Sequence, residues 1–545
     1  MKALTFILFF LLITSQVFTQ NVSQQWVERY NGTANSTDYS YALTLDPSSN
    51  VIVTGYSTNT STSKDMTVVK YDNSGNLIWS RTYDGPNHGG DYSFAVASDM
   101  NGNIYVTGRC DGGATNADIT TLAYSPSGVP LWNAVYDGPA HNFDQGNCIS
   151  VDNSGNVYVA GMSMGVSSNQ DIVVIKYNSS GVQQWAQRYN GPANGNDAAY
   201  SMAIDASGNT YVTGECIVSY SYEYVTIKYS TDGVQQWVNT YQGPAGGDVA
   251  SVVKLDGAGN VYVTGESQGI TTGVDFATLK YDNAGTLRWV QRYNSPSNGG
   301  DFANAMAVTT AGDVYVTGST SGVGVNDSMY ATVKYNTDGV LQWAQNYSGP
   351  GLATDIPRAI CLDDQENIYI SGSSYSSIFP TNSTDYVTIK YDPDGNQIWL
   401  RSYNGPASSQ DYASSVAVDH DGNVFVTGRS MGVTSGFDFA TIKYTILVGI
   451  QPVSNQIPDK FRLWQNYPNP FNPSTKIKFD LPFSSSVAIK IYNIEGKEAL
   501  NLFNGSLSPG SYEYTVDASS LASGIYFYRI TANGFTDTKR MALVK

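Results

Sequence analysis

The chain has 545 residues, a formal net charge of −17 and four cysteines. An acidic surface repels phosphate backbones, so this charge argues against a nucleic acid as a partner. Four cysteines are too few for a disulfide framework in a chain of this length. No stretch after the N-terminal leader reaches the ~18 apolar residues of a transmembrane helix.

The N-terminus has the pattern of a secretory signal peptide. Met1 and Lys2 precede an apolar run from Phe6 to Ile13, and small or polar residues follow from Ser15 to Thr19. The apolar run is too short to span a bilayer, and no cysteine there marks a lipoprotein. We therefore predict a signal peptide over residues 1–19 and a soluble, exported mature chain.

Between residues 20 and 444 the chain repeats a unit of about 50 residues, a period typical of propeller blades. Residues 248–293 show the unit clearly, as four runs rich in β-branched and aromatic residues between turns of Gly, Asp and Asn. Such runs are typical of a four-stranded antiparallel meander. A tryptophan marks each fourth run: Trp26, Trp79, Trp132, Trp185, Trp237, Trp289, Trp343 and Trp399.

The two ends of the repeat array predict how it closes. The last unit ends its third run at Tyr444 with no tryptophan run behind it, whereas a surplus tryptophan run, residues 25–30, precedes the first unit. If the N-terminal run completes the last sheet, no sheet edge stays open. We predict an all-β fold in which residues 20–444 form an eight-bladed β-propeller of four-stranded blades, closed by the N-terminal strand.

The sequence of the units resembles the SBBP family of β-propeller repeats. The matching pattern is Asp-x-x-Gly-Asn followed by a Tyr-Val-Thr-Gly run, as in residues 205–214, then residues 385–391 and a strand with Trp399. The family name implies seven blades, but the units in this sequence count to eight. The resemblance implies a propeller and carries no established chemistry to this chain.

Residues 459–545 have a different composition, with ten Lys and Arg against seven Asp and Glu. This segment closely resembles the type A C-terminal sorting domain of the type IX secretion system. The matching residues are Asn466, Pro468, Asn469, Pro470, Phe471, Gly524, Tyr526 and the terminal Lys545. The resemblance implies a small β-sandwich behind a linker at residues 445–458, the type IX machinery as a partner, and a secreted or cell-surface protein.

On the propeller, the long fourth-to-first and second-to-third connections share one face, and functional residues concentrate on long loops. There each first run follows an acid, and we call these residues the ring acids: Asp38, Asp91, Asp144, Asp197, Asp248, Asp301, Asp355 and Asp411. Such an Asp accepts hydrogen bonds from loop amides. The alternative is that the ring attracts a hard cation such as Ca²⁺; apart from Ca²⁺ or another divalent cation, no cofactor is predicted.

Two histidines occupy equivalent positions in adjacent units, each three residues before a ring acid. His88 with Asp91, and His141 with Asp144, could chelate Zn²⁺ or another transition metal. The alternative is that both histidines are solvated loop residues, because the loops of adjacent blades diverge outward. His420 lies in a short turn on the opposite face.

Aromatic residues mark two unusual second-to-third connections. Tyr375 and Phe379 lie in the longest of these, in the seventh unit, and Tyr220 and Tyr222 lie in the fourth. Exposed aromatic rings suit sugar rings or a protein partner. The alternative is that these rings fold onto the rim of their own blade.

The four cysteines are isolated in the sequence, which favours small apolar fillers over a bridge between blades. No nucleophile elbow, phosphate-binding loop or zinc-protease motif is present. The sequence therefore predicts a non-enzymatic, secreted or surface-displayed propeller that binds a glycan or a protein through its long-loop face. The alternative is an extracellular polysaccharide hydrolase or lyase, because carboxylates are abundant.

Overall fold

The computed structural model describes residues 22–545, except 61–62, 115, 323–327, 352–353, 377–382, 447–449, 455–456 and 508. The described residues form strands and no helices, which confirms the all-β prediction. Within these residues no helix is long and apolar enough to cross a membrane. The predicted signal peptide, residues 1–19, lies outside the described part.

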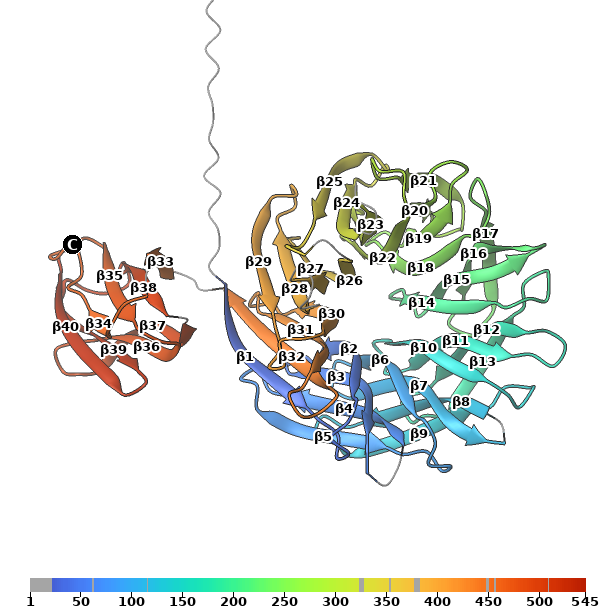
Figure 1. Ribbon diagram of the computed structural model, residues 1–545, viewed down its shortest axis with the longest axis horizontal. Helices are drawn as coiled ribbons and strands as arrows, with labels where there is room; N and C mark the ends of the chain where they lie inside the picture. The colour runs from blue at the N-terminus through green and yellow to red at the C-terminus, as the bar shows by residue number, and fades with distance from the viewer. Residues whose placement is uncertain are drawn as a thin grey trace, which may run out of the picture.

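In the described part of residues 22–446 the strands form eight four-stranded antiparallel sheets around a ring (Figure 1). The first strands surround the axis and are β2 (Tyr39–Leu45), β6 (Tyr92–Ser98), β10 (Asp144–Val151), β14 (Ala198–Ile204), β18 (Val249–Leu255), β22 (Asp301–Val308), β26 (Ile356–Leu362) and β30 (Asp411–Val418). The second strands are β3 (Val51–Thr58), β7 (Ile104–Gly113), β11 (Val157–Met164), β15 (Thr210–Val218), β19 (Val261–Gln268), β23 (Val314–Ser321), β27 (Ile368–Tyr375) and β31 (Val424–Met431).

The outer two strands of each sheet follow the same order. The third strands are β4 (Lys64–Tyr71), β8 (Asn116–Tyr124), β12 (Gln170–Tyr177), β16 (Ser221–Tyr229), β20 (Val274–Tyr281), β24 (Ser328–Tyr335), β28 (Thr384–Tyr391) and β32 (Phe437–Ile446). The fourth strands are β5 (Leu77–Tyr83), β9 (Pro130–Tyr136), β13 (Gln183–Tyr189), β17 (Gln235–Tyr241), β21 (Leu287–Tyr293), β25 (Leu341–Tyr347), β29 (Gln397–Tyr403) and β1 (Val22–Tyr30). We number the sheets 1 to 8 from β2–β5 to the sheet of β30–β32.

Strand β1 completes sheet 8 from the other end of the sequence. It runs antiparallel to β32, with Trp26 opposite Lys443 and Tyr30 opposite Phe439. The sequence predicted this pairing from the surplus tryptophan run. On the inner side, β2 contacts β30 and β31, so sheets 8 and 1 are neighbours in the ring.

A steric constraint explains why each unit has a glycine in its second strand. In every sheet the first strand bulges beside this glycine, and at Gly265 a Cβ atom would overlap the carbonyl oxygen of Val249 and press on Ala250. The same backbone approach occurs at Gly55, Gly108, Gly161, Gly214, Gly318, Gly372 and Gly428. Only a residue without a side chain fits where two strands approach this closely.

The tryptophans link neighbouring sheets. Trp132 of sheet 2 packs on Gly181 in the third-to-fourth turn of sheet 3, and its Nε1 donates a 3.1 Å hydrogen bond to the carbonyl of Ser179. Gly181 has a φ of 80°, a conformation that favours glycine. The tryptophans of β1, β5, β13, β17, β21 and β25 contact the next turn in the same way.

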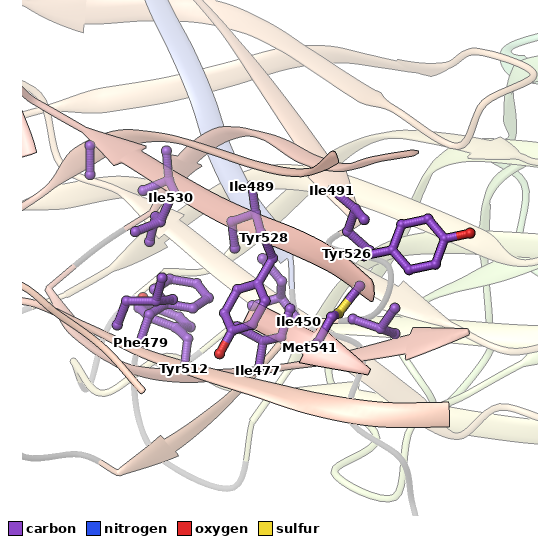
Figure 2. Packing of buried hydrophobic residues seen from close by; sticks show 14 of the residues in the cluster. Ile450, Ile477, Phe479, Ile489, Ile491, Tyr512, Tyr526, Tyr528, Ile530 and Met541 are labelled. Atoms are coloured by element: carbon purple, nitrogen blue, oxygen red, sulfur yellow. The ribbon is translucent and has the colours of Figure 1, made fainter. Parts of the chain in front are cut away.

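The chain after the ring forms a two-sheet sandwich. One sheet has β33 (Ile450–Ser454), β38 (Gly510–Asp517), β35 (Ser474–Leu481) and β34 (Arg462–Leu463); the other has β37 (Glu498–Leu507), β36 (Ser485–Tyr492), β39 (Gly524–Ala532) and β40 (Phe535–Leu543). Residues 445–458 were expected to be a linker, yet β33 lies within them and pairs with β38. Figure 2 shows the core between the sheets, built from Ile477, Phe479, Ile489 and Tyr528 among others.

We predict that Gly265→Ala lowers the free energy of unfolding by about 1–3 kcal/mol or more, as overpacking does. The atoms in the way are backbone atoms of β18, which cannot move without breaking its pairing with β19. Gly524→Ala is the control, because the nearest atom to its added Cβ lies 3.7 Å away. Denaturant unfolding followed by fluorescence measures both; equal stability of the two variants would contradict the steric account.

Candidate functional site

The ring acids are all fully buried at the start of the first strands. Asp197 is typical: its two oxygens accept hydrogen bonds from the amides of Gly191, at 2.5 Å, and Ile217, at 3.0 Å. Asp38 accepts from Gly32 and Thr58 in the same way. This arrangement fits the loop-amide interpretation, because each of these two carboxylates ties the incoming loop to the end of the second strand.

Burial governs the acidity of the ring acids. It raises the pKa of Asp38 to about 6, against hydrogen bonds from Gly32 and Thr58 that lower it. Burial also raises the pKa values of Asp91, Asp144, Asp197, Asp301 and Asp411. In the short turns opposite, burial raises the pKa of Asp205, but hydrogen bonds from Asn209 and Ser207 outweigh it and leave the pKa lowered.

Acids on the third strands have two kinds of surroundings. In sheets 3, 5 and 8 an arginine of the fourth strand neutralises the acid, as where Arg188 pairs with Asp171 at 2.7 Å. Sheets 1 and 2 have Thr82 and Val135 at the arginine position. There two groups of three carboxylates lie with ligand atoms within 4.8 Å of one another: Asp65, Asp84 and Asp91, and Asp118, Asp137 and Asp144.

The two histidines of the predicted metal site lie at the edge of these groups. His88 Nδ1 contacts Asp84 at 2.5 Å and His141 Nδ1 contacts Asp137 at 2.6 Å, and both rings are more than two-thirds exposed. His88 and His141 thus attach to two different carboxylate groups, and among the described residues neither group includes a histidine as a ligand. Metal binding stays a prediction.

The predicted aromatic contacts lie at the long-loop face in different settings. Tyr220 is fully exposed at the tip of the β15–β16 hairpin, beside Ser219 with a φ of 62°. Tyr222 is half-buried within β16, and Tyr375 ends β27. Phe379 lies outside the described residues. Other second-to-third connections expose Val166, Ile270 and Val433 at their tips.

A pocket at the axis lies among the first strands of sheets 7, 8 and 1. Its volume is about 460 Å³ and it is lined by residues of β26, β27, β30, β31 and β2: Ile356, Arg358, Ser373, Tyr412, Ala413, Ser414, Arg429, Ser40 and Tyr41. We call it the channel-mouth pocket, because these residues lie at the starts of first strands and the ends of second strands, on the long-loop side. Its size is within the range of small-ligand sites.

The charge around this channel is divided between its two halves. The position after the second-strand glycine is Arg429 in sheet 8 and Arg109 in sheet 2, but Glu215 and Glu266 in sheets 4 and 5. Burial raises the pKa of both glutamates, and Tyr200 donates a 2.8 Å hydrogen bond to Glu215. Our sequence reasoning missed this pattern, which an alignment of the units at this one position would have revealed.

The residues of the sorting motif come together in the sandwich. Asn466 is buried and donates its amide to Tyr528 Oη at 2.7 Å, and its side chain reaches Thr475. Phe471 is buried in the sandwich core and its amide bonds to the carbonyl of Ala542 in β40. The remaining motif residues lie around this segment and the chain end: Pro468, Asn469, Pro470, Gly524, Tyr526 and Lys545.

Two segments match family models. Residues 465–544 match the secretion system C-terminal sorting domain, and residues 403–432 match the SBBP β-propeller repeat. The chain carries a propeller repeat and a sorting domain. The sorting domain marks the protein as secreted or displayed on the cell surface and implies interaction with the type IX secretion system.

More distant similarities are found with one curated protein and with several solved structures. The WD repeat-containing protein L264 of Acanthamoeba polyphaga mimivirus is 25% identical over 454 residues, which cover 67% of this chain and 31% of that protein. This chain thus spans less than a third of that relative. Among solved structures, a fungal alcohol oxidase of the AA5 family in complex with copper is 11% identical with a TM-score of 0.40, covering 96% and 99% of the two chains. A gluconolactonase from Xanthomonas campestris is 12% identical with a TM-score of 0.28, covering 53% and 90%.

The four cysteines of the ring form no disulfide bonds. Cys110, Cys148, Cys216 and Cys361 are all free thiols, and each is buried or half-buried. Burial raises the pKa of Cys148 and Cys216 to about 12. These thiols are therefore unreactive at neutral pH, as expected of apolar fillers.

We predict that the protein becomes more stable as the pH falls from 7 to about 4.5. The pKa of folded Asp38, about 6, lies above the ~3.9 of an unfolded Asp, so its stabilising contribution is full below about 4 and is lost as the pH rises through about 6. The short-turn acids such as Asp205, with lowered pKa values, lose their contribution only below about 4.

Urea unfolding at a series of pH values measures this dependence. The maximum should lie at about pH 4–5 and should persist in about 0.5 M NaCl, because salt screens surface charge but not buried carboxylates. A steady loss of stability from pH 7 downwards would contradict the assignment of raised pKa values to the ring acids.

Proposed function

We propose that the protein is a non-enzymatic extracellular binding protein that holds a glycan or a protein at its long-loop face. The channel-mouth pocket carries this proposal, because it is a concave site with aromatic, hydroxyl and guanidinium groups in one place. Ligand-binding sites are usually concave and largely apolar, with a few polar groups that point to the same place. The sorting domain delivers this site to the outside of the cell.

The long-loop face offers more contact area around the pocket. Tyr220, Tyr222 and Tyr375 lie on this face, and Val166 and Val433 are exposed at neighbouring loop tips. Exposed aromatic rings carry much of the binding energy at glycan and protein interfaces. The short turns opposite are nearly uniform, since an Asp, Asn, Ser or Thr side chain at the start of the turn accepts backbone amides, as Asp205 and Asn178 do.

A polysaccharide hydrolase or lyase is the second candidate. Glu215 and Glu266 are equivalent residues of adjacent sheets, and burial raises the pKa of each carboxyl. A pair of carboxyl groups with different environments is the usual machinery of glycoside cleavage. The ring acids themselves are poor candidates, because they are fully buried and accept loop amides with both oxygens at Asp38 and Asp197.

We predict that the secreted chain binds members of an array of extracellular glycans without releasing reducing sugar. The double variant Tyr220→Ala and Tyr375→Ala should weaken that binding about tenfold, because each ring contributes on the order of 1 kcal/mol of contact. His420→Ala, in a short turn on the opposite face, is the control.

Three results would contradict the proposal. Loss of binding in His420→Ala alone would place the ligand on the short-turn face and not on the long-loop face. Release of reducing sugar that disappears in Glu266→Gln would establish the hydrolase or lyase instead. Absence of binding to glycans and to extracellular proteins alike would exclude the binding function itself.

A further inference from the structure

We propose that the channel-mouth pocket binds the carboxylate of a uronic acid residue in an extracellular polysaccharide. This inference rests on the proposed function and names the ligand class for the same face. It starts from two guanidinium groups, those of Arg358 on β26 and Arg429 on β31, which line the pocket together.

The two arginines lack an acidic partner. In the part of the chain that the structure describes, Arg358 and Arg429 form no ion pair, and Arg429 Nε is buried without a hydrogen-bond acceptor. Partial loss of water contact lowers the pKa of Arg358, and the charge of Arg429 lowers it further, so the two cations are near one another. Arg358 is exposed and Arg429 is half-buried, and an anion bound between them would offset their mutual repulsion.

Three other arginines of the ring pair with an acid within their own sheet. Arg29, Arg188 and Arg292 occupy equivalent places on fourth strands, and each pairs with a third-strand Asp at 2.6 to 2.7 Å. Each also bonds to a serine of the second strand. An acid therefore accompanies the arginine at these structural positions, whereas the pocket supplies none for Arg358 or Arg429.

The surroundings of Arg429 hold its guanidinium group ready for a ligand. Its carbon lies 4.2 Å from the ring centroid of Tyr39, 4.6 Å from that of Tyr412 and 5.5 Å from that of Phe437. Aromatic contacts occupy the faces of a guanidinium and leave the N–H donors at its edge, which match the two oxygens of a carboxylate. A carboxylate bound there would also reduce the repulsion between Arg358 and Arg429.

The rest of the lining favours a sugar over an acidic peptide. Ser373, Ser414, Tyr41 and Tyr412 contribute hydroxyl groups beside the arginines, in a pocket of about 460 Å³. Hydroxyl groups and aromatic rings are the usual partners of a polyhydroxylated ring. On the far side of the channel Glu215 and Glu266 repel further carboxylates, which directs an acidic chain toward the arginine half.

The test is calorimetric titration of the full secreted chain with oligomers of galacturonate, glucuronate, and mannuronate with guluronate. Carboxyl-reduced versions of the same oligomers and a glutamate oligopeptide are the comparison probes. At least one uronate should bind about tenfold or more tightly than its reduced version, and Arg358→Gln should remove that advantage. Arg288→Gln is the matched control, because Arg288 lies on the outer strand β21, is exposed and pairs with Asp282.

Arg358→Gln also has a readout that needs no ligand. Its melting temperature should equal or exceed that of the parent chain, because the substitution removes an exposed cation that is repelled by Arg429 and has no acidic partner among the described residues. A clear drop would mean that Arg358 stabilises the fold, and would overturn the assignment of this residue to a ligand.

The remaining outcomes separate this inference from the proposed function. Equal binding of acidic and reduced sugars, or uronate binding unaffected by Arg358→Gln, overturns the uronate assignment while binding at the long-loop face stands. Binding of the glutamate peptide alone, lost in Arg358→Gln, assigns the pocket to an acidic protein segment. Failure of every uronate to bind overturns the inference even where the array finds another glycan.

Discussion

The structure of the ring depends on the contact between each tryptophan and the turn of the next sheet. Each tryptophan ring packs directly on a glycine of that turn, where a Cβ atom would overlap the ring and where the positive φ also favours glycine. The indole N–H bonds to a carbonyl of the same turn. This contact joins seven of the eight sheet boundaries among the described residues. The boundary between sheets 7 and 8 differs, because sheet 8 has no third-to-fourth turn.

Strand β1 takes the place of that turn. Among the described residues, the buried indole N–H of Trp399 in sheet 7 has no hydrogen-bond partner, and Arg401 instead donates to the carbonyl of Val22 at the start of β1. Further along β1, Arg29 bonds to Asp438 at 2.7 Å and to the carbonyl of Ser430. Ser430 follows Arg429, so the closing strand also supports the wall of the channel-mouth pocket, which spans sheets 7, 8 and 1.

Much of the fold was predictable because the constraints that set it are local and repeated. The glycine beside each bulge, the tryptophan of each fourth strand and the Asp, Asn, Ser or Thr that begins each short turn recur with one period, and they mark strands and turns directly. The position of β33 was missed because a short strand within a linker has no sequence pattern of its own.

The candidate site was harder to predict because it depends on differences among similar units. The ring acids drew attention by their repetition, and repetition proved to reflect a structural duty: Asp197 and Asp38 bind loop amides. Arg358 and Arg429 stand where other units carry different residues, and they lie far apart in the sequence. Only the closed ring brings sheets 7, 8 and 1 together around one pocket.

Hydrogen exchange followed by mass spectrometry tests the closure of the ring most directly. If β1 completes sheet 8, the amides of Val22–Tyr30 exchange as slowly as those of the equivalent strand β29, because both form ladders with a third strand. Complete exchange of β1 within seconds, beside a protected β29, would contradict closure by the N-terminal strand and with it the arrangement of the pocket.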